Sequence, residues 1–108
     1  MARRRNRRTG RALAPSRGGL EFARWVEDQV RDIPPGHVAT YGDISPRSPR
    51  RVGYVLATSR EELPWHRVVR SNGTVAMGAE QLELLRREGV PINGDRVDLV
   101  RARYGNAR

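Results

Sequence analysis

The residues best suited to do chemistry stand together in one short run, Pro64-Trp65-His66-Arg67-Val68-Val69. Pro64 holds its φ angle at about −65° and so fixes the approach of the chain to the tryptophan. An indole beside an imidazole can line a pocket that has one flat apolar wall and one polar edge. The alternative is a strand start in which Trp65 fills the hydrophobic core, and these residues alone leave both interpretations open.

The composition excludes several other kinds of chemistry. The chain has no cysteine, which excludes disulfides, thiolate metal sites and thiol nucleophiles. Its two histidines, His37 and His66, do not have the spacing of zinc ligands, so we expect neither a metal nor a cofactor. The residues do not favour a hydrolytic enzyme, because no activated nucleophile accompanies the histidines.

Positive charge is concentrated at the start of the chain. All 21 basic residues are arginines, and the net charge is +9. Residues 1–19 hold seven of them and no acid, so we expect a disordered, arginine-rich arm that grips phosphates or is simply a solvated tail. Residues 20–108 hold the other fourteen against twelve acids, a net of +2, so charge alone does not establish DNA binding there.

Length and hydropathy indicate one domain. A chain of 108 residues supports a modest core, which we expect over residues 20–104, with a frayed tail at 105–108. No run of about 18 apolar residues predicts a membrane span, and the polar start is unlike a secretory signal. We therefore expect no membrane partner and a cytoplasmic monomer that joins the nucleoid when it binds DNA.

Three segments have helical periodicity. Residues 20–33 place apolar side chains three to four apart, which predicts a helix with Trp25 in the core. Residues 46–58 offer Ser48 as N-cap and Pro49 at the first helical position. Residues 79–88 form the last predicted helix, and Gly89 is suited to end it.

A short helix is also predicted between the first two. Thr40 and Asp43 have the spacing of a capping box, and the free N–H groups of such a helix start can hold a phosphate beside Tyr41. A capped connector with a half-buried Tyr41 is the alternative.

Turn residues predict two hairpins. Asn72-Gly73 lies between Val68-Val69 and Val75, and Asn93-Gly94 precedes an alternating Val97 and Leu99. The second hairpin would be a terminal wing, with Tyr104 holding the end of the chain. The fold class expected is mainly α with small β-hairpins, a single winged helix-turn-helix-like domain.

Four motifs over residues 20–92 resemble the O6-alkylguanine-DNA alkyltransferases, in the same order. Residues 33–44 match every fixed position of Ile-Pro-x-Gly-x-Val-x-Thr-Tyr-Gly-x-Ile, which opens the family's helix-turn-helix. Residues 50–53 are similar to its Arg-Ala-Val-Gly, and residues 84–89 to its Leu-Leu-x-x-Glu-Gly. Residues 64–69 resemble its Pro-Cys-His-Arg-Val-Val, but Trp65 replaces the cysteine that accepts the alkyl group. This version is similar to the alkyltransferase-like proteins, which bind the same lesions without repairing them.

The resemblance implies a non-enzymatic protein that binds O6-alkylguanine in double-stranded DNA through the minor groove and flags it for nucleotide excision repair proteins. Tyr41 would help swing the nucleotide out, and Arg50 would fill the gap in the base stack. The expected DNA-binding and flipping residues are Thr40, Tyr41, Arg50, Arg51 and Gly53. The expected lesion pocket comprises Pro64, Trp65, His66, Arg67, Val69 and Ser71, with Glu88 supporting His66.

A winged helix-turn-helix regulator or architectural DNA-binding protein without a lesion pocket is the second hypothesis. It accounts for the arm, the paired helices and the hairpins. It gives no reason for Pro64-Trp65-His66-Arg67 or for Glu88. Such a protein would bind DNA with no regard to alkylation.

Overall fold

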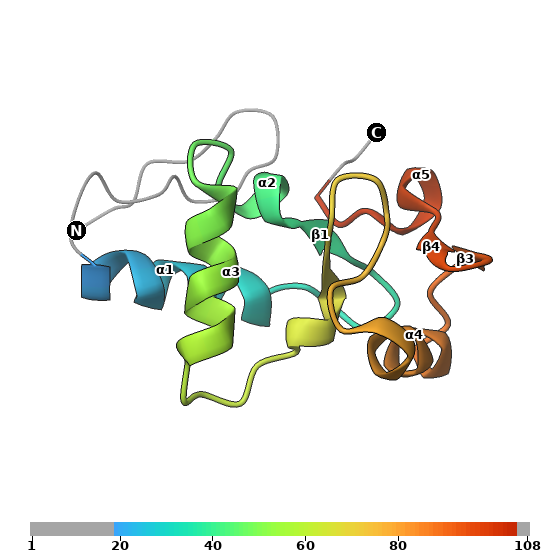
Figure 1. Ribbon diagram of the computed structural model, residues 1–108, viewed down its shortest axis with the longest axis horizontal. Helices are drawn as coiled ribbons and strands as arrows, with labels where there is room; N and C mark the ends of the chain where they lie inside the picture. Colours follow the sequence, from blue (N-terminus) through green and yellow to red (C-terminus); the bar gives the residue numbers. More distant parts are fainter. Residues whose placement is uncertain (1–18, 106–108) are drawn as a thin grey trace.

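The computed structural model describes residues 19–105, so most of the expected arm (1–19) and tail (105–108) lies outside the described residues. Helices predominate, with two small sheets between and beside them (Figure 1). The elements in chain order are α1 (Gly19–Arg31), β1 (Ala39–Thr40), α2 (Tyr41–Ile44), α3 (Pro49–Thr58), the 3-10 helix η1 (Trp65–Arg67), β2 (Val68–Val69), α4 (Gly78–Arg87), β3 (Ile92–Asn93), β4 (Arg96–Val97) and α5 (Leu99–Ala102). The predicted fold class, mainly α with small β-hairpins, is confirmed in that the structure is mainly helical with small sheets, although only one of these sheets is a hairpin.

The first core cluster lies where α3 crosses α1, with α2 beside them (Figure 1). The apolar stripe of α1 faces this core, and Trp25 is only 4% exposed, as predicted. The helix ends at Arg31 because a residue before proline is disfavoured in helical conformation. Ile33 is therefore buried from the following loop rather than from the helix.

The first predicted hairpin does not form, because Val68-Val69 pairs with a different segment than Val75. Val68-Val69 pairs in parallel with β1, in the register Ala39 with Val68 and Thr40 with Val69. The turn at Asn72-Gly73 does form, because the Gly73 N–H donates to the Arg70 carbonyl at 2.8 Å. This turn also bonds to the second hairpin, because the Val97 N–H of β4 donates to the Gly73 carbonyl at 2.8 Å. Val75 consequently does not fold back as a strand.

The second predicted hairpin is confirmed and is shorter than expected. Strands β3 and β4 are antiparallel, with Asn93 opposite Arg96. The Asp98 side chain then accepts a hydrogen bond from the Arg101 N–H and caps α5, so Leu99 is helical and α4 is not the last helix. Tyr104 holds the end as predicted, because its N–H donates to the Val38 carbonyl at 2.7 Å.

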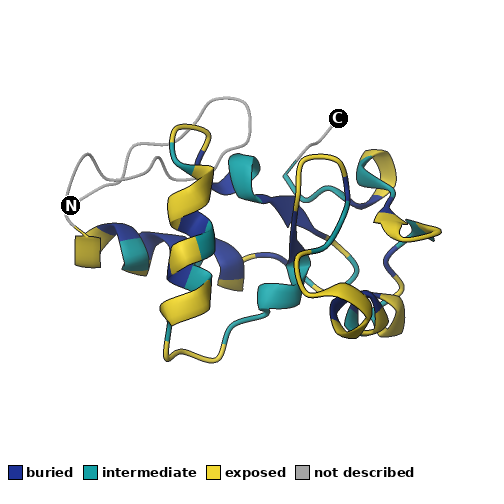
Figure 2. Ribbon diagram, viewed as in Figure 1, coloured by how far each residue is buried: buried dark blue, intermediate teal, exposed yellow. Residues whose placement is uncertain are grey.

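Helix α4 ends as the sequence predicts, and this ending positions Glu88. Gly89 has a φ of +81°, a conformation that glycine adopts without steric cost. The N–H groups of Gly89 and Val90 donate to the carbonyls of Arg86 and Leu85 at 3.0 and 3.1 Å, which completes a Schellman cap. Buried residues of α4 face the second core cluster, while its outer face is exposed (Figure 2).

Candidate nucleic-acid interface

Helix α2 begins with the predicted capping box. The Thr40 hydroxyl accepts from the Asp43 N–H at 2.9 Å, and the Asp43 carboxylate accepts from the Thr40 N–H at 3.0 Å. Thr40 is 3% exposed, so its side chain serves the cap and does not itself reach solvent. The sequence placed Thr40 among DNA-contacting residues, whereas in the structure it orients the residue after it.

That residue, Tyr41, is half-buried against the first core cluster. Burial raises the pKa of its phenol, and the positive charge of Arg70 partly opposes this rise. The hydroxyl is therefore protonated at neutral pH and available as a hydrogen-bond donor.

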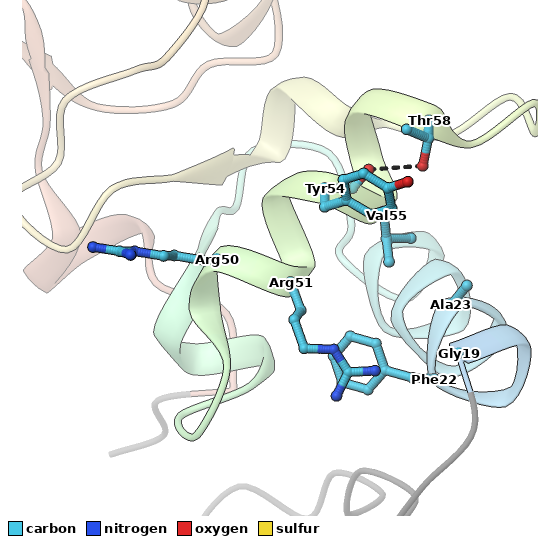
Figure 3. A pocket seen from close by; sticks show the side chains of 8 residues that line it. All are labelled: Gly19, Phe22, Ala23, Arg50, Arg51, Tyr54, Val55 and Thr58. Carbon is cyan, nitrogen blue, oxygen red and sulfur yellow. Dashed lines mark hydrogen bonds between the residues drawn. The ribbon is translucent and has the colours of Figure 1, made fainter.

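Helix α3 presents two adjacent arginines that differ in environment. Ser48 precedes the helix as predicted, but its side chain makes no capping hydrogen bond. The Arg51 guanidinium lies 4.0 Å from the centre of the Phe22 ring, a cation–π contact that ties α3 to α1. Arg50 is exposed, makes no hydrogen bond or ion pair with the described part of the chain, and points away from α1 (Figure 3). Within residues 19–105, Arg50 is therefore the less engaged of the two side chains.

A shallow groove of about 380 Å³ separates α1 from the outer side of α3. It is lined by Gly19, Phe22, Ala23, Arg50, Arg51, Tyr54, Val55 and Thr58 (Figure 3). Tyr54 is 71% exposed on this face. The groove borders the arginine-bearing end of α3, and sequence reasoning did not single out Tyr54.

Gly53 is not required by packing within the protein. A Cβ atom there would lie 3.8 Å from the Tyr41 ring, an ordinary van der Waals distance. The close approach of another molecule, such as a DNA backbone, therefore remains the predicted reason for the glycine.

Replacing Gly53 with alanine is expected to change stability and binding in opposite directions. Alanine favours a helix interior over glycine by about 0.8–1 kcal/mol, so the midpoint of urea unfolding should rise. Affinity for duplex DNA should fall because the added methyl group holds the backbone away from α3. Thr58→Ala, which raises helix propensity at the far end of α3, should leave affinity unchanged. Unaltered DNA affinity of the Gly53 variant would contradict the role given to this residue.

Trp65 is half-buried in the structure. It begins η1, in which no residue is fully buried, and it belongs to neither core cluster. The Trp65 and His66 rings meet edge to face, with centroids 6.0 Å apart and planes at 87°. Pro64 directly precedes them with φ at −76°. The two rings place an apolar face beside a polar edge, and a lesion pocket lined by them stays a prediction.

Glu88 joins His66 and Arg67 in one network. Its Oε2 lies 2.9 Å from His66 Nε2, the contact implied by the resemblance. Arg67 donates to both carboxylate oxygens, from Nε at 2.9 Å and from Nη2 at 2.7 Å, and from Nη1 to the Ile33 carbonyl at 2.8 Å. The hydrogen bonds from Arg67 chiefly lower the pKa of Glu88 to about 2, with His66 also contributing.

Arg67 and Val69 were expected in the lesion pocket, but both are engaged within the protein. The Arg67 guanidinium is engaged with Glu88 and Ile33, and Val69 is completely buried in the second core cluster. Ser71 is exposed on the turn that follows β2. The physical reason is that β2 lies between the two core clusters, so Val68 packs into the first and Val69 into the second.

Gln81 is a supporting residue that sequence reasoning missed. It is 1% exposed, and its amide group donates to the carbonyls of His66 and Val68 at 3.0 and 2.9 Å. Its Oε1 accepts from the Met77 N–H at 3.1 Å. The available signal was a glutamine next to Leu82 on the apolar side of α4, where a buried amide needs partners.

Among residues 19–105, no group of three or more His, Cys, Asp or Glu side chains could hold a metal ion. Within the same residues, no helix combines the length and the apolar character needed to cross a membrane.

The capped helix α2, the following helix α3 with an exposed arginine at its start, and the hairpin of β3 and β4 define a winged helix-turn-helix type of DNA-binding domain. Residues 21–90 match the family model described as the DNA-binding domain of 6-O-methylguanine DNA methyltransferase. The chain belongs to this family.

Relatives of the chain include proteins named for base flipping and for their likeness to alkyltransferases. The Escherichia coli K12 DNA base-flipping protein is 41% identical over 95 residues, covering 77% of this chain and 74% of that protein. Alkyltransferase-like protein 1 of Schizosaccharomyces pombe is 39% identical over 85 residues, covering 67% and 79%. A solved structure of S. pombe Atl1 with damaged DNA containing O6-carboxymethylguanine matches with a TM-score of 0.68 at 30% identity, covering 79% of this chain and 95% of that one.

Proposed function

We propose that this protein binds O6-alkylguanine in duplex DNA and does not remove the alkyl group. The observation that carries the proposal is the half-buried Trp65, which stands edge-on to His66. By the motif resemblance, it takes the place of the alkyltransferase cysteine. A tryptophan cannot accept an alkyl group as a thiolate does, but its ring face can contact one. The similarity to a protein solved with an alkylated guanine supports the same lesion class.

The proposed binding mode begins with α3 in the minor groove. Arg50 enters the base stack, and Tyr41 helps hold the nucleotide that has swung out. The flipped base lies beside Trp65, His66 and the exposed Ser71. Opening a base step requires a few kcal/mol, and an inserted side chain offsets part of it. Alkylation weakens the pairing of the base, so a damaged base is flipped more easily than an intact one, which favours binding at the damaged site.

The network behind the pocket has a structural role in this proposal. Glu88, which Arg67 holds by two hydrogen bonds, contacts the His66 ring, and Gln81 holds the backbone of η1 and β2. Without a cysteine to activate, the His66–Glu88 pair orients the polar edge of the pocket. We further propose that the monomer acts on chromosomal DNA in the cytoplasm and that the complex flags the lesion for nucleotide excision repair proteins.

The test is a binding titration at physiological salt with two duplexes that differ only in O6-methylguanine or guanine at one position. We expect tighter binding to the methylated duplex, and mass spectrometry of the recovered DNA should show the methyl group still present. Equal affinity for the two duplexes would favour a regulator or architectural protein without a lesion pocket. Loss of the methyl group would contradict the non-enzymatic function.

A third duplex with a larger O6-alkyl group tests the role of Trp65. Each buried methylene contributes about 0.8 kcal/mol, so affinity should be kept or should rise with alkyl size. Trp65→Ala should abolish this dependence, because the apolar wall is gone.

A further inference from the structure

The parallel pairing of β1 and β2 brings together two residues that the sequence separates widely. Thr40 pairs with Val69, and both are the last residues of their strands. The next residues, Tyr41 and Arg70, therefore follow the strands at the same end of the sheet. Trp65 and His66 precede β2 in the adjoining η1. Arg70 therefore lies between the tyrosine proposed to hold the flipped nucleotide and the turn that carries Ser71.

The turn holds Arg70 in place by its backbone. The Arg70 N–H donates to the Thr74 carbonyl at 2.9 Å, and the Arg70 carbonyl accepts from the Gly73 N–H at 2.8 Å. Thr74 is itself fixed, because its hydroxyl donates to Asn72 Oδ1 at 2.7 Å. A Cβ at Gly73 would lie 2.5 Å from the Val97 carbonyl oxygen, so only glycine lets the wing pack against this turn.

Within residues 19–105, the Arg70 guanidinium has only weak, neutral partners. It is exposed, and Nη1 lies 3.4 Å from the Thr74 hydroxyl and 3.3 Å from the Val75 carbonyl. No carboxylate pairs with it within residues 19–105. Its charge nonetheless acts on Tyr41, since it lowers the phenol pKa that burial raises. A cation and a protonated hydroxyl thus follow the paired strands at the same end of the sheet.

We propose that Arg70 is a further DNA-binding residue, which contacts the phosphodiester next to the flipped nucleotide together with the Tyr41 hydroxyl. This inference rests on the proposed function. Flipping turns a nucleotide about its own backbone, so the adjoining phosphates follow it towards the pocket. A guanidinium can bind phosphate oxygens through two parallel N–H bonds, and Arg70 can exchange its two long bonds to neutral acceptors for these.

The first measurement compares Arg70→Gln with Arg86→Gln on guanine and O6-methylguanine duplexes over a range of salt concentrations. Arg86 is a matched control, because it is exposed and its only described side-chain bond is a 3.5 Å contact with the Gly94 carbonyl. We expect Arg70→Gln to weaken binding to the methylated duplex about tenfold and to reduce the slope of log K against log salt by about 1. Arg86→Gln should change the affinity less than about twofold.

The second measurement replaces the phosphate on one side of the lesion, and then that on the other, with a neutral methylphosphonate. At one position the replacement should weaken the wild type about as much as Arg70→Gln does on the ordinary duplex, and should weaken Arg70→Gln little further. Fully additive losses at both positions would overturn the phosphate contact. So would a loss that varies with the O6-alkyl group and not with the phosphate, since that pattern indicates a contact to the base edge.

The outcomes separate this inference from the proposed function. If the wild type does not prefer the methylated duplex, the proposed function fails and the role of Arg70 fails with it. If the wild type prefers it and Arg70→Gln behaves as Arg86→Gln does, only the role of Arg70 is contradicted. Thermal unfolding of both variants at the wild-type temperature shows that neither effect arises from misfolding.

Discussion

Replacing Arg50 with alanine is expected to weaken binding to an O6-methylguanine duplex about a hundredfold. An inserted side chain offsets part of an unstacking free energy of a few kcal/mol, and about 2.7 kcal/mol corresponds to a hundredfold change in affinity. The Arg50 side chain is exposed and makes no bond with the described part of the chain, so its removal should leave stability within about 0.5 kcal/mol. Titration of the two duplexes and urea unfolding measure the two effects separately.

Arg51→Ala is the matched control, because it removes the same charge one residue along α3. Arg51 lies over the Phe22 ring, so the control should lose some stability through the cation–π contact and only a modest part of its DNA affinity. The Arg50 variant should also lose its preference for the alkylated duplex, whereas the Arg51 variant should keep it. Equal losses for the two variants would mean that α3 contributes charge alone and inserts nothing into the stack.

Local signals in the sequence predicted the elements that carry these residues. Thr40 and Asp43 form the capping box that their spacing indicated, and Gly89 ends α4 with a positive φ. Both are contacts between residues near each other in the chain, where residue type determines the conformation. The resemblance to alkyltransferases likewise indicated the His66–Glu88 pair, which the structure brings to 2.9 Å.

Contacts between distant segments were harder to predict. The pairing of Val68-Val69 with β1 depends on which edge is free after folding, and the Asn72-Gly73 turn pattern says nothing about that. Arg67 was expected in the pocket, but its bonds to Glu88 and Ile33 arise from segments 21 and 34 residues away. Gln81 was missed for the same reason. The roles of the site residues toward DNA stay predictions.

The largest expected effect on stability is that of Glu88→Gln, for which we expect a loss of about 2 kcal/mol at pH 7. Hydrogen bonds to charged groups contribute about 1.5–3 kcal/mol, and the neutral amide cannot serve both His66 and Arg67 as the carboxylate does. The side chains of Arg67 and Glu88 are 14% and 20% exposed, so water compensates only part of the lost pairing. Glu83→Gln, which breaks an exposed ion pair with Arg87, should change stability by less than about 0.5 kcal/mol.

The stabilisation by Glu88 should depend on pH and should be lost in acid. The pKa of Glu88 is lowered from 4.5 to about 2 in the folded protein, so the ionised carboxylate stabilises the fold fully above pH 4.5. As the pH falls from 4.5 towards 2, the folded protein must take up a proton at Glu88 and this contribution is lost. Urea unfolding at several pH values should therefore show the wild type and the Glu88 variant converging below pH 4.5. Parallel profiles over that interval would mean that the carboxylate does not hold Arg67 and His66, and the pocket edge would then need another support.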